Sequence, residues 1–339
     1  MCQHRCVIPP GKRGLCRSRE NREGKLYSLI YGIHTHGIQV DNIEKKPMYH
    51  FHPGTLVASV GTFFCNFRCK QCLNWFYAQP DYPSFNGDLS VLHQHGVGIT
   101  PRDLVNKVRE LGCSGIAFTY NEPTIWLEYV YDTAKLAKEA GLYTVFVTNG
   151  FITSEALDFI GPHIDAYSVD FKGFSDKAYR RQSSVSKLGE IPAVTKRAQD
   201  KWGMKVEITT LIIPGINDDL QEISEMADWI VKNLGANTPW HVSRFSPDRV
   251  PDPEFRKILP TLVAVLKKCA EVGRERGLNC VFIWAPPSGG SGDFYAEGDT
   301  ICPECRQAVI KRDLWQPDLS GVSEEGKCAH CGYDLDICL

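Results

Sequence analysis

The sequence lacks the features that mark membrane, secreted and nucleic-acid-binding proteins. No apolar stretch approaches the length of a membrane span. The first residues, Met1 to Cys6, lack the apolar core of a signal peptide. The net charge of −2 gives no electrostatic reason to expect nucleic acid or a membrane surface as a partner. We therefore expect a cytoplasmic protein.

Two common enzyme motifs are also missing. The glycine-rich stretch at residues 289–292 is not followed by the Lys-Ser/Thr pair of a Walker loop or by a helix signal, so we interpret it as a linker. The Gly-x-Ser-x-Gly motif is absent, and no Ser/His/Asp arrangement can be read from the chain. Phosphate-loop and serine-hydrolase chemistry are therefore not indicated.

Cysteine, in contrast, is abundant, with 14 residues grouped mostly in short-spaced sets. In a chain without a visible signal peptide, such grouping favours metal binding over disulfides. We expect Cys113 and Cys280, which lie near apolar runs, to be small core residues. The candidate metal ligands form three sets: Cys2, Cys6 and Cys16; Cys65, Cys69 and Cys72; and Cys302, Cys305, Cys328 and Cys331.

From Leu56 onward, apolar runs alternate with amphipathic segments, which predicts βα units and a parallel sheet. Thr100 and Thr153 are expected to cap two of the helices. We divide the chain into a Cys-rich extension (1–54), a βα domain (55–288) and a small C-terminal module (289–339). Six βα units match a partial (β/α)6 barrel, although the pattern alone also allows an open doubly wound sheet. We expect strands at residues 56–61, 115–120, 143–148, 166–170, 205–213, 240–244 and 279–284.

The middle cysteine set has C-x3-C-x2-C spacing and directly follows the apolar run at 56–61. Three thiolates on one tight loop can hold three irons of a four-iron, four-sulfur (4Fe–4S) cluster. Because no fourth cysteine lies nearby, one iron would stay open to another ligand. Core cysteines, a disulfide and three zinc ligands are the alternative interpretations.

The same loop resembles the cluster loop of radical S-adenosylmethionine (radical SAM) enzymes. The likeness extends from Cys2 to about Tyr333 and is strongest to the radical SAM member of the AmmeMemoRadiSam system, a group close to the activating enzymes of glycyl-radical proteins. The family usually carries an aromatic residue before the last cysteine of the loop, where this chain has Gln71. The stretches that carry the likeness are DNIEKKP at 41–47, CNF at 65–67, TYNEPT at 119–124 and PWH at 239–241.

This resemblance implies a TIM-like partial barrel in which the open iron of the cluster is chelated by the amino and carboxylate groups of SAM. It also implies that SAM is bound at the carboxyl ends of the strands. There Glu122 and Asn149 would contact SAM, and Lys172, ordered by Asp170, would pair with the SAM carboxylate. Thr210 would add a polar contact, and His241 could touch the ribose or the substrate. Structural roles remain open for these residues: Glu122 as an acid at a helix N-terminus, Asp170 and Lys172 as an ion pair, and His241 as an ordinary strand-end histidine.

The C-terminal cysteines form two C-x2-C pairs, Cys302/Cys305 and Cys328/Cys331. Four thiolates suit tetrahedral zinc or rubredoxin-type iron, and a metal could stabilise so small a module. We expect the segment between the pairs to form a small sheet that packs back on the barrel. The N-terminal set is one ligand short of a tetrahedral site, and His4 or Cys338 could supply the fourth.

The leading interpretation is a radical SAM enzyme that cleaves SAM reductively to a 5′-deoxyadenosyl radical, which abstracts hydrogen from an unidentified substrate. Reduced ferredoxin or flavodoxin would supply the electron. Two alternatives remain: an activase that installs a glycyl radical on a partner protein, and a zinc-dependent binding or scaffold protein. By resemblance only, AMMECR1-like and Memo-like proteins are candidate partners.

Overall fold

Residues 1–80, 89–288 and 294–339 are described by the computed structural model, in which the chain divides into two units. The expected linker at 289–292 lies outside the described residues. Each unit collects segments that lie far apart in the sequence. Unit 1 contains Met1–Asp41, Leu56–Tyr167 and Gly189–Met204, and unit 2 contains Asn42–Thr55, Ser168–Leu188 and Lys205–Leu339.

Unit 1 is built on three adjacent parallel strands, β5 (Leu56–Val60), β7 (Gly115–Phe118) and β8 (Tyr143–Thr148). Strand β4 (Gln39–Asn42) lies beside β5. The three parallel strands are buried almost throughout, as expected of parallel strands that are covered on both faces. Their carboxyl ends lead into the loops that carry Cys65, Glu122 and Asn149.

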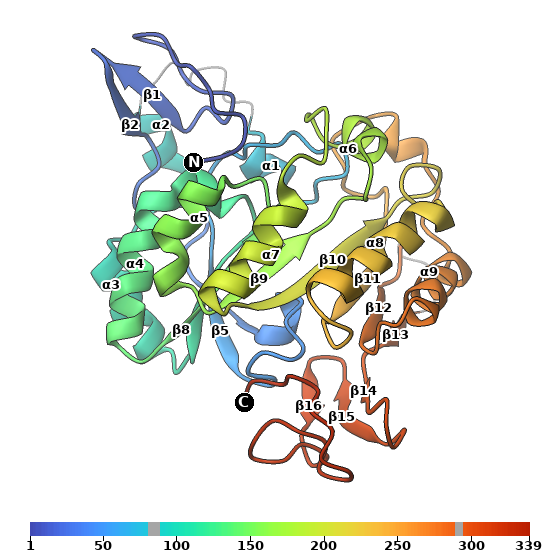
Figure 1. Ribbon diagram of the computed structural model, residues 1–339. Coiled ribbons are helices and arrows are strands. Elements are labelled where there is room, and N and C mark those ends of the chain that lie inside the picture. The colour runs from blue at the N-terminus through green and yellow to red at the C-terminus, as the bar shows by residue number, and fades with distance from the viewer. Residues whose placement is uncertain (81–88, 289–293) are drawn as a thin grey trace. The chain divides into compact units, whose positions relative to one another are not determined.

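Four helices of unit 1 follow one another in lateral contact: α3 (Pro101–Glu110), α4 (Leu127–Glu139), α5 (Ser154–Ile160) and α7 (Ile191–Trp202) (Figure 1). The two predicted caps are confirmed. The hydroxyl of Thr100 accepts from the Asp103 N–H over 3.2 Å, and that of Thr153 accepts from the Ala156 N–H over 3.3 Å. These hydroxyls satisfy donors that a helix N-terminus leaves unpaired.

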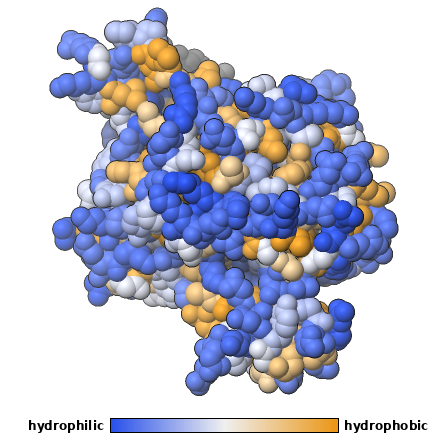
Figure 2. Space-filling view, viewed as in Figure 1, coloured by the Kyte–Doolittle hydropathy of each residue, from blue (hydrophilic) through white to orange (hydrophobic). Residues whose placement is uncertain are grey.

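The smaller elements of unit 1 surround this framework. An antiparallel hairpin pairs β1 (Arg19–Arg22) with β2 (Lys25–Ser28), and β3 (Ile33–His34) pairs with β6 (Val97–Gly98). Figure 2 shows apolar surface in the region of the hairpin, where Leu26 is exposed, as is Leu15 in the loop before it. The short helices are α1 (Trp75–Ala78), α2 (Leu89–His95), η2 (Pro123–Trp126) and η3 (Gly161–His163).

Unit 2 contains parallel neighbours β10 (Lys205–Ile212), β11 (Trp240–Arg244) and β12 (Val281–Ala285). Strand β13 (Tyr295–Glu297) runs antiparallel beside β12. Helices α8 (Leu220–Asn233) and α9 (Val263–Glu275) contact each other, and α9 packs against β11 and β12. Strand β9 (Ala166–Asp170) lies beside β10 and enters unit 2 at Ser168. The remaining short elements are η1 (Ile43–Lys45), α6 (Asp176–Gln182) and η4 (Phe255–Lys257).

A small antiparallel sheet of β14 (Thr300–Ile301), β15 (Ala308–Asp313) and β16 (Gln316–Asp318) forms the C-terminal part of unit 2 (Figure 1). Its Val309 and Ile310 share a buried core with Cys280 and Phe282 of the segment around β12. Trp315 also packs on Trp284 of β12, with ring centroids 4.3 Å apart. The prediction of a small sheet that packs back on the main strands is therefore confirmed.

All seven strands expected from the sequence are present, as β5 and β7 to β12. The pairings β5–β7–β8 and β10–β11–β12 are parallel, which agrees with the βα alternation. Cys113 and Cys280 are buried, as predicted for small core residues. Within the described part of the chain, none of the helices combines the length and apolar character that a membrane crossing requires.

Candidate functional site

The loop after β5 (residues 61–74, called the cysteine loop below) approaches the end of β7 so closely that its first residue must be glycine. A Cβ added to Gly61 would lie 2.6 Å from the carbonyl oxygen of Thr119. Real Cβ atoms do not approach a backbone oxygen this closely, because the atoms would overlap. The chain can therefore leave β5 in this direction only without a side chain at this position.

Asn121, which follows β7, holds the beginning of the cysteine loop through both ends of its side-chain amide. Its Nδ2 donates to the carbonyl of Phe64 over 2.7 Å, and its Oδ1 accepts from the N–H of Thr62 over 3.2 Å. One side chain thus satisfies two backbone groups that a loop would otherwise leave to water.

The three cysteines of the loop are partly to fully buried. Cys69 is buried, whereas Cys65 and Cys72 are half-buried. The N–H of Phe67 donates to Cys65 Sγ over 3.4 Å. Burial, followed by the neighbouring Cys69, holds the pKa of the Cys65 thiol well above its ordinary value. Cys65 therefore carries its proton in the metal-free chain and must release it when a metal binds.

This thiol set fits a cluster better than a single ion. Cys65, Cys69 and Cys72 do not form a compact group of ligand atoms. Among the described residues, such a group, with all its ligand atoms within 4.8 Å of one another, is found only for the C-terminal cysteines. A 4Fe–4S cluster binds each cysteine to a different iron, so it holds the thiolates farther apart than one ion does. A buried amide N–H of the adjacent Asn66 also has no acceptor among the described residues, as expected where a sulfur-rich group is to be bound.

Glu122 caps η2 from the carboxyl end of β7, and its carboxylate is occupied by protein donors. Oε1 accepts from the N–H of Thr124 over 3.0 Å and from the hydroxyl of Thr148 over 2.8 Å. Oε2 accepts from the N–H of Asn149 over 2.8 Å. The carboxylate therefore fastens the end of β8 to the end of β7, and the residue is 1% exposed.

Asn149 continues this network to the cysteine loop. Its Nδ2 donates to Oδ1 of Asn66 over 2.8 Å. Asn66 lies beside Cys65, whose thiol is 3.6 Å from the same Oδ1. The structure thus brings Glu122, Asn149 and the cysteine loop together in unit 1, where the sequence predicted them at neighbouring strand ends.

The N-terminal arm is docked beside this network. The N–H of Gln3 donates to the carbonyl of Phe151 over 3.0 Å, and Nε2 of His4 lies 2.9 Å from the carbonyl of Asn66. The His4 ring packs edge-on against Phe151, with centroids 5.0 Å apart. His4 is therefore engaged with the cysteine loop rather than with Cys2, Cys6 and Cys16.

Cys2, Cys6 and Cys16 line one pocket of about 80 Å³, together with Arg19 and Thr124. Their sulfur atoms do not form a compact ligand group in the described residues. Burial raises the pKa of the Cys2 thiol, which keeps it protonated in the metal-free chain. Of the two candidate fourth ligands, Cys338 lies in unit 2, where its N–H donates to the carbonyl of His50 over 2.8 Å.

Asp170 and Lys172 meet at the carboxyl end of β9, as their alternation predicted. Lys172 Nζ donates to Asp170 Oδ2 over 2.7 Å. The lysine side chain is 12% exposed and the aspartate side chain 40%, so the pair faces a partly open space. The backbone around Lys172 is fixed, because Asn217 Nδ2 donates to its carbonyl over 2.9 Å. This geometry holds a cation in place beside an accessible carboxylate.

Thr210 is buried in unit 2. Its hydroxyl accepts from the indole N–H of Trp240 over 3.0 Å. The side chain is 0% exposed and therefore forms part of the core.

His241 was expected at the carboxyl end of a strand, and this position is corrected by the structure. It is the second residue of β11, near the opposite end. Its Nε2 lies 2.6 Å from Glu207 Oε2, and the histidine side chain is 6% exposed. Glu207 also accepts from the backbone N–H groups of Tyr49 and His50. The strand expected at 240–244 is present with these bounds, and His241 lies near its amino end rather than its carboxyl end.

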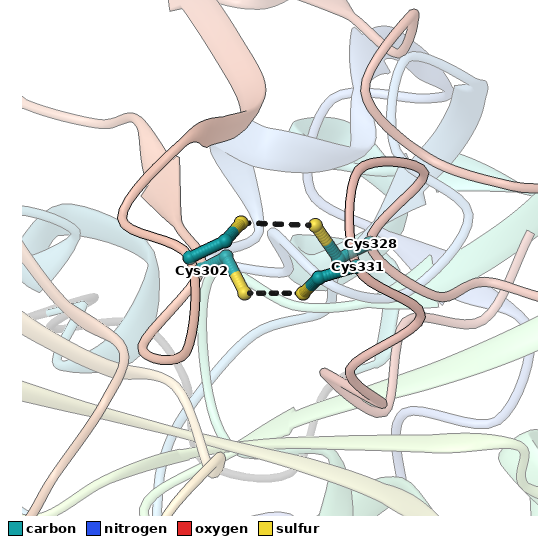
Figure 3. A group of neighbouring side chains, drawn as sticks. Cys302, Cys328 and Cys331 are labelled. Atoms are coloured by element: carbon teal, nitrogen blue, oxygen red, sulfur yellow. Dashed lines mark hydrogen bonds between the residues drawn. The ribbon is translucent and has the colours of Figure 1, made fainter.

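The C-terminal cysteines form a compact group (Figure 3). Cys302 and Cys331 have sulfur atoms 3.6 Å apart, and those of Cys305 and Cys328 are 3.7 Å apart. A disulfide has a sulfur–sulfur distance of about 2.0 Å. A tetrahedron with metal–sulfur bonds of about 2.3 Å has edges of about 3.8 Å. The observed spacing therefore fits four ligands of one ion.

Each cysteine pair is a tight backbone turn. The N–H of Arg306 donates to the carbonyl of Cys302 over 3.0 Å, and that of Gly332 donates to Cys328 over 2.8 Å. Arg306 and Gly332 both have positive φ, of 62° and 78°. Glycine adopts this conformation at little cost, so Gly332 permits the chain to turn behind the sulfur atoms.

The pKa of Cys328 indicates that one of these thiols ionises readily. Burial raises this pKa, but hydrogen bonds from the backbone N–H groups of His330 and Cys331 outweigh burial and lower it to about 7. A thiolate is the form that binds a metal. The group can therefore bind a metal ion near neutral pH.

Three residues of these networks were missed by sequence reasoning: Asn66, Asn121 and Glu207. The first two lie within motifs that were noticed for other reasons, and an isolated asparagine carries no periodicity signal. Glu207 left a visible signal, because it is the one charged residue in the interior of the strand Lys205–Ile212. A charge in such a strand requires a buried partner.

Comparison with known proteins assigns the family. The family described as the Radical SAM superfamily matches residues 59–230. An uncharacterized protein of Methanocaldococcus jannaschii is 34% identical over 342 residues, which span 100% of this chain and 95% of that protein. A pyruvate formate-lyase-activating enzyme of Clostridium pasteurianum is 26% identical over 50% of this chain and 67% of its own length.

A solved structure shares the fold. The crystal structure of a radical SAM methyltransferase from Sphaerobacter thermophilus superposes with a TM-score of 0.50 and 16% identity, over 69% of this chain and 67% of that chain. At this identity the likeness concerns the α/β fold alone.

Proposed function

Because this chain belongs to the radical SAM superfamily and is an enzyme, we propose that Cys65, Cys69 and Cys72 bind a 4Fe–4S cluster with one open iron for SAM. Held there and reduced by one electron, such a cluster would supply the electron that cleaves SAM to methionine and a 5′-deoxyadenosyl radical, and the radical would take a hydrogen atom from a substrate. The observation that carries the proposal is the cysteine loop at the carboxyl end of β5, held by Gly61 and Asn121. In parallel α/β proteins, ligands bind at these strand ends.

We assign the contacts to SAM to Lys172 and Asn149, which Asp170 and Glu122 hold in place, and give the other candidates structural roles. Lys172, held by Asp170, suits the SAM carboxylate, because an ammonium and a carboxylate form a charge-assisted hydrogen bond. Asn149 lies beside the cysteine loop, and Glu122 orients it. Thr210 and His241 are occupied inside unit 2, so neither is assigned to SAM or to catalysis. The partial (β/α)6 barrel is our proposal for the strands from β5 to β11.

The experiment that tests this function is anaerobic reconstitution with iron and sulfide, followed by incubation with SAM and dithionite. We expect 5′-deoxyadenosine from the wild type and none from Cys69→Ala, which lacks one cluster ligand. Cys113→Ala is the matched control, because Cys113 is also a buried cysteine of unit 1 but lies outside the loop. Deoxyadenosine formation by Cys69→Ala at the control's rate would overturn the proposal.

We propose one narrower alternative, which rests on the names of two relatives. Half of this chain resembles a pyruvate formate-lyase-activating enzyme and a putative glycyl-radical enzyme activating enzyme of Methanocaldococcus jannaschii, the second at 26% identity. The substrate would then be a backbone glycine of a partner protein. Incubation of the reconstituted enzyme, SAM and dithionite with that partner would leave a glycyl radical that electron paramagnetic resonance detects. A diffusible small-molecule product would contradict this alternative.

The partners follow from the same proposal. Reduced ferredoxin or flavodoxin would deliver the electron, since the reaction consumes one electron for each SAM that is cleaved. By resemblance to the AmmeMemoRadiSam system, AMMECR1-like and Memo-like proteins are proposed partners. Binding of purified candidates, measured by calorimetry, tests each of them separately.

Zinc is our proposal for Cys302, Cys305, Cys328 and Cys331. Four thiolates close the coordination sphere and leave no open position for a substrate, which is typical of a structural zinc site. For Cys2, Cys6 and Cys16 we propose a second metal site, supported by the one pocket that they share. Metal analysis of a Cys65/Cys69/Cys72 triple variant, with and without Cys302→Ala, counts the ions that remain at each site.

A further inference from the structure

The hydrogen bonds around Asn66 can be assigned donor by donor. The N–H of Phe151 donates over 3.0 Å to one atom of the Asn149 amide, which must be Oδ1, because a backbone N–H cannot accept. The other atom of that amide is Nδ2, and it donates to Asn66 over 2.8 Å. The receiving atom of Asn66 is therefore Oδ1. A single backbone donor thus fixes the orientation of two side-chain amides in succession.

This assignment leaves Nδ2 of Asn66 as a donor with no acceptor among the described residues. The residue is 4% exposed, so bulk water does not take the place of a partner. Native proteins rarely leave a buried N–H without an acceptor, because its lost hydration is not replaced. The orphan donor therefore points to a partner that the polypeptide itself does not supply.

The neighbouring residue Cys65 changes its hydrogen-bonding role when it binds iron. In the metal-free chain its thiol donates toward Oδ1 of Asn66 over 3.6 Å, while its sulfur accepts from the N–H of Phe67 over 3.4 Å. Iron binding removes the thiol proton, so the sulfur can then only accept. The sulfur atoms bound to iron therefore act as hydrogen-bond acceptors near Asn66, whose Nδ2 has no acceptor among the described residues.

We propose that Nδ2 of Asn66 donates a hydrogen bond to a sulfur atom of the cluster held by Cys65, and thereby raises the reduction potential of that cluster. The inference rests on the proposed function. Hydrogen bonds to the sulfur atoms are one of the properties that set the potential of an iron–sulfur cluster. The reduced cluster carries one more negative charge than the oxidised cluster, so a donor stabilises the reduced form more.

The donor is held in place from several directions. His4 Nε2 donates to the carbonyl of Asn66 over 2.9 Å, since a carbonyl oxygen can only accept. Asn149 fixes the side-chain amide, and Glu122 in turn binds the Asn149 N–H over 2.8 Å. Asn149 is thus a positioning residue for Asn66. A donor that is fixed before the cluster is reduced needs no rearrangement to act.

The test is a redox titration of the reconstituted protein without SAM, followed by optical or paramagnetic resonance spectroscopy. In Asn66→Ala we expect the ratio of reduced to oxidised cluster at a fixed potential to fall about tenfold, a shift of about 59 mV for one electron. Asn149→Ala should give a smaller shift in the same direction. Asn21→Ala is the control, because Asn21 also lies in unit 1, but its amide is hydrogen-bonded to Ile8 and Gly24 and not to the cysteine loop; its potential should equal that of the wild type.

Several outcomes would overturn the inference. The first is a wild-type reduction potential in Asn66→Ala, and the second is an equal shift of the potential in all three variants. The third is a shift that appears only after SAM is added, which would mean that the Asn66 N–H donates to SAM and not to the cluster. If Asn66→Ala binds too little iron to titrate, Asn149→Ala decides, and its wild-type potential would overturn the inference. A wild-type protein that binds no iron–sulfur cluster would instead contradict the proposed function, so the two failures are distinguishable.

Discussion

Glu122 is a buried carboxylate that accepts only from protein donors in unit 1. Burial raises its pKa, and the donors on Thr124 and Asn149 oppose that rise. Every atom facing the carboxylate at Thr124, Thr148 and Asn149 donates, so the site is built for a group that only accepts. An amide in the same place would direct its own N–H groups at other N–H groups or hydroxyls.

Glu122→Gln should therefore lower the free energy of unfolding by about 2 kcal/mol, the usual effect of losing hydrogen bonds to a buried charged group. Urea denaturation of the metal-free protein measures it. Glu155→Gln is the matched control, because Glu155 also lies at a helix start but its side chain is 69% exposed in a pair with Arg5. We expect a much smaller change there. Equal changes in both variants would contradict the role given to the buried network.

The residue types around the proposed metal sites could be predicted from the sequence, but their hydrogen bonds could not. The spacing of Cys65, Cys69 and Cys72 identified the loop. No feature of the loop sequence distinguished Asn66 from any other loop asparagine. The role of Asn66 depends on Phe151 and Asn149, which lie more than 80 residues away in the chain. Such a contact becomes visible only once the strands have been brought together.

The cysteine loop is an element whose path depends on one glycine. Gly61→Ala would force the loop away from Thr119 by overlap with its carbonyl oxygen. We expect the variant to lose about 1–3 kcal/mol of unfolding free energy, a range typical of overpacking, and to retain less iron and sulfide per chain after reconstitution. Gly98→Ala is the control, because a Cβ there meets no heavy atom within 4 Å. Full iron content in Gly61→Ala would show that the loop adapts.

The two cysteine turns of the C-terminal sheet are a second element with a testable dependence. A chelator should increase amide hydrogen exchange throughout residues 300–337, because the metal joins the two turns. The effect should be stronger below pH 7. Protonation of Cys328, whose pKa is about 7, then competes with the metal. In Cys305→Ala the amides of residues 300–337 should exchange rapidly even without chelator, whereas in Cys269→Ala, a variant in α9, they should stay protected until chelator is added. Equal protection with and without chelator would contradict a structural metal.

Helices and strands were largely predictable, because their signals are local. Thr100 and Thr153 were identified as caps from residue type and position, and both accept the expected N–H. The error at His241 concerns its position within the strand. The strand expected at 240–244 is β11 with the same bounds, but the motif at 239–241 lies at the beginning of it, so the resemblance that placed His241 beside the ligand put it at the wrong end.

At the scale of the molecule, the two units are assembled from interleaved segments. Residues 42–55 belong to unit 2 although the chain on both sides of them belongs to unit 1. Glu207 shows how this segment is held: its Oε1 and Oε2 accept from the N–H of Tyr49, 158 residues away in sequence. Composition and periodicity cannot predict such a partition, because it depends on buried contacts between distant residues.

Arg312 extends the same network to the C-terminal sheet. It donates to the carbonyl of Tyr49 over 2.6 Å and to the hydroxyl of Thr300 over 3.0 Å. The hydroxyl of Thr300 also lies 3.0 Å from His50 Nε2. Loss of Glu207 should therefore weaken unit 2 as a whole rather than one strand of it.

Glu207→Gln should lower the free energy of unfolding at pH 7 by about 3 kcal/mol, because it breaks a buried pair with His241. Burial raises the pKa of Glu207, but the hydrogen bond and charge of His241 outweigh burial and hold it below its ordinary value. The stabilisation by the ionised carboxylate is therefore complete above about pH 4.3, the ordinary pKa, and is lost as pH falls through the lowered pKa. Denaturation between pH 3 and 7 should show this loss in the wild type and in Glu225→Gln, an exposed control on α8. The Glu207→Gln variant should show a flatter profile; the same slope in all three proteins would mean that Glu207 does not hold unit 2 together.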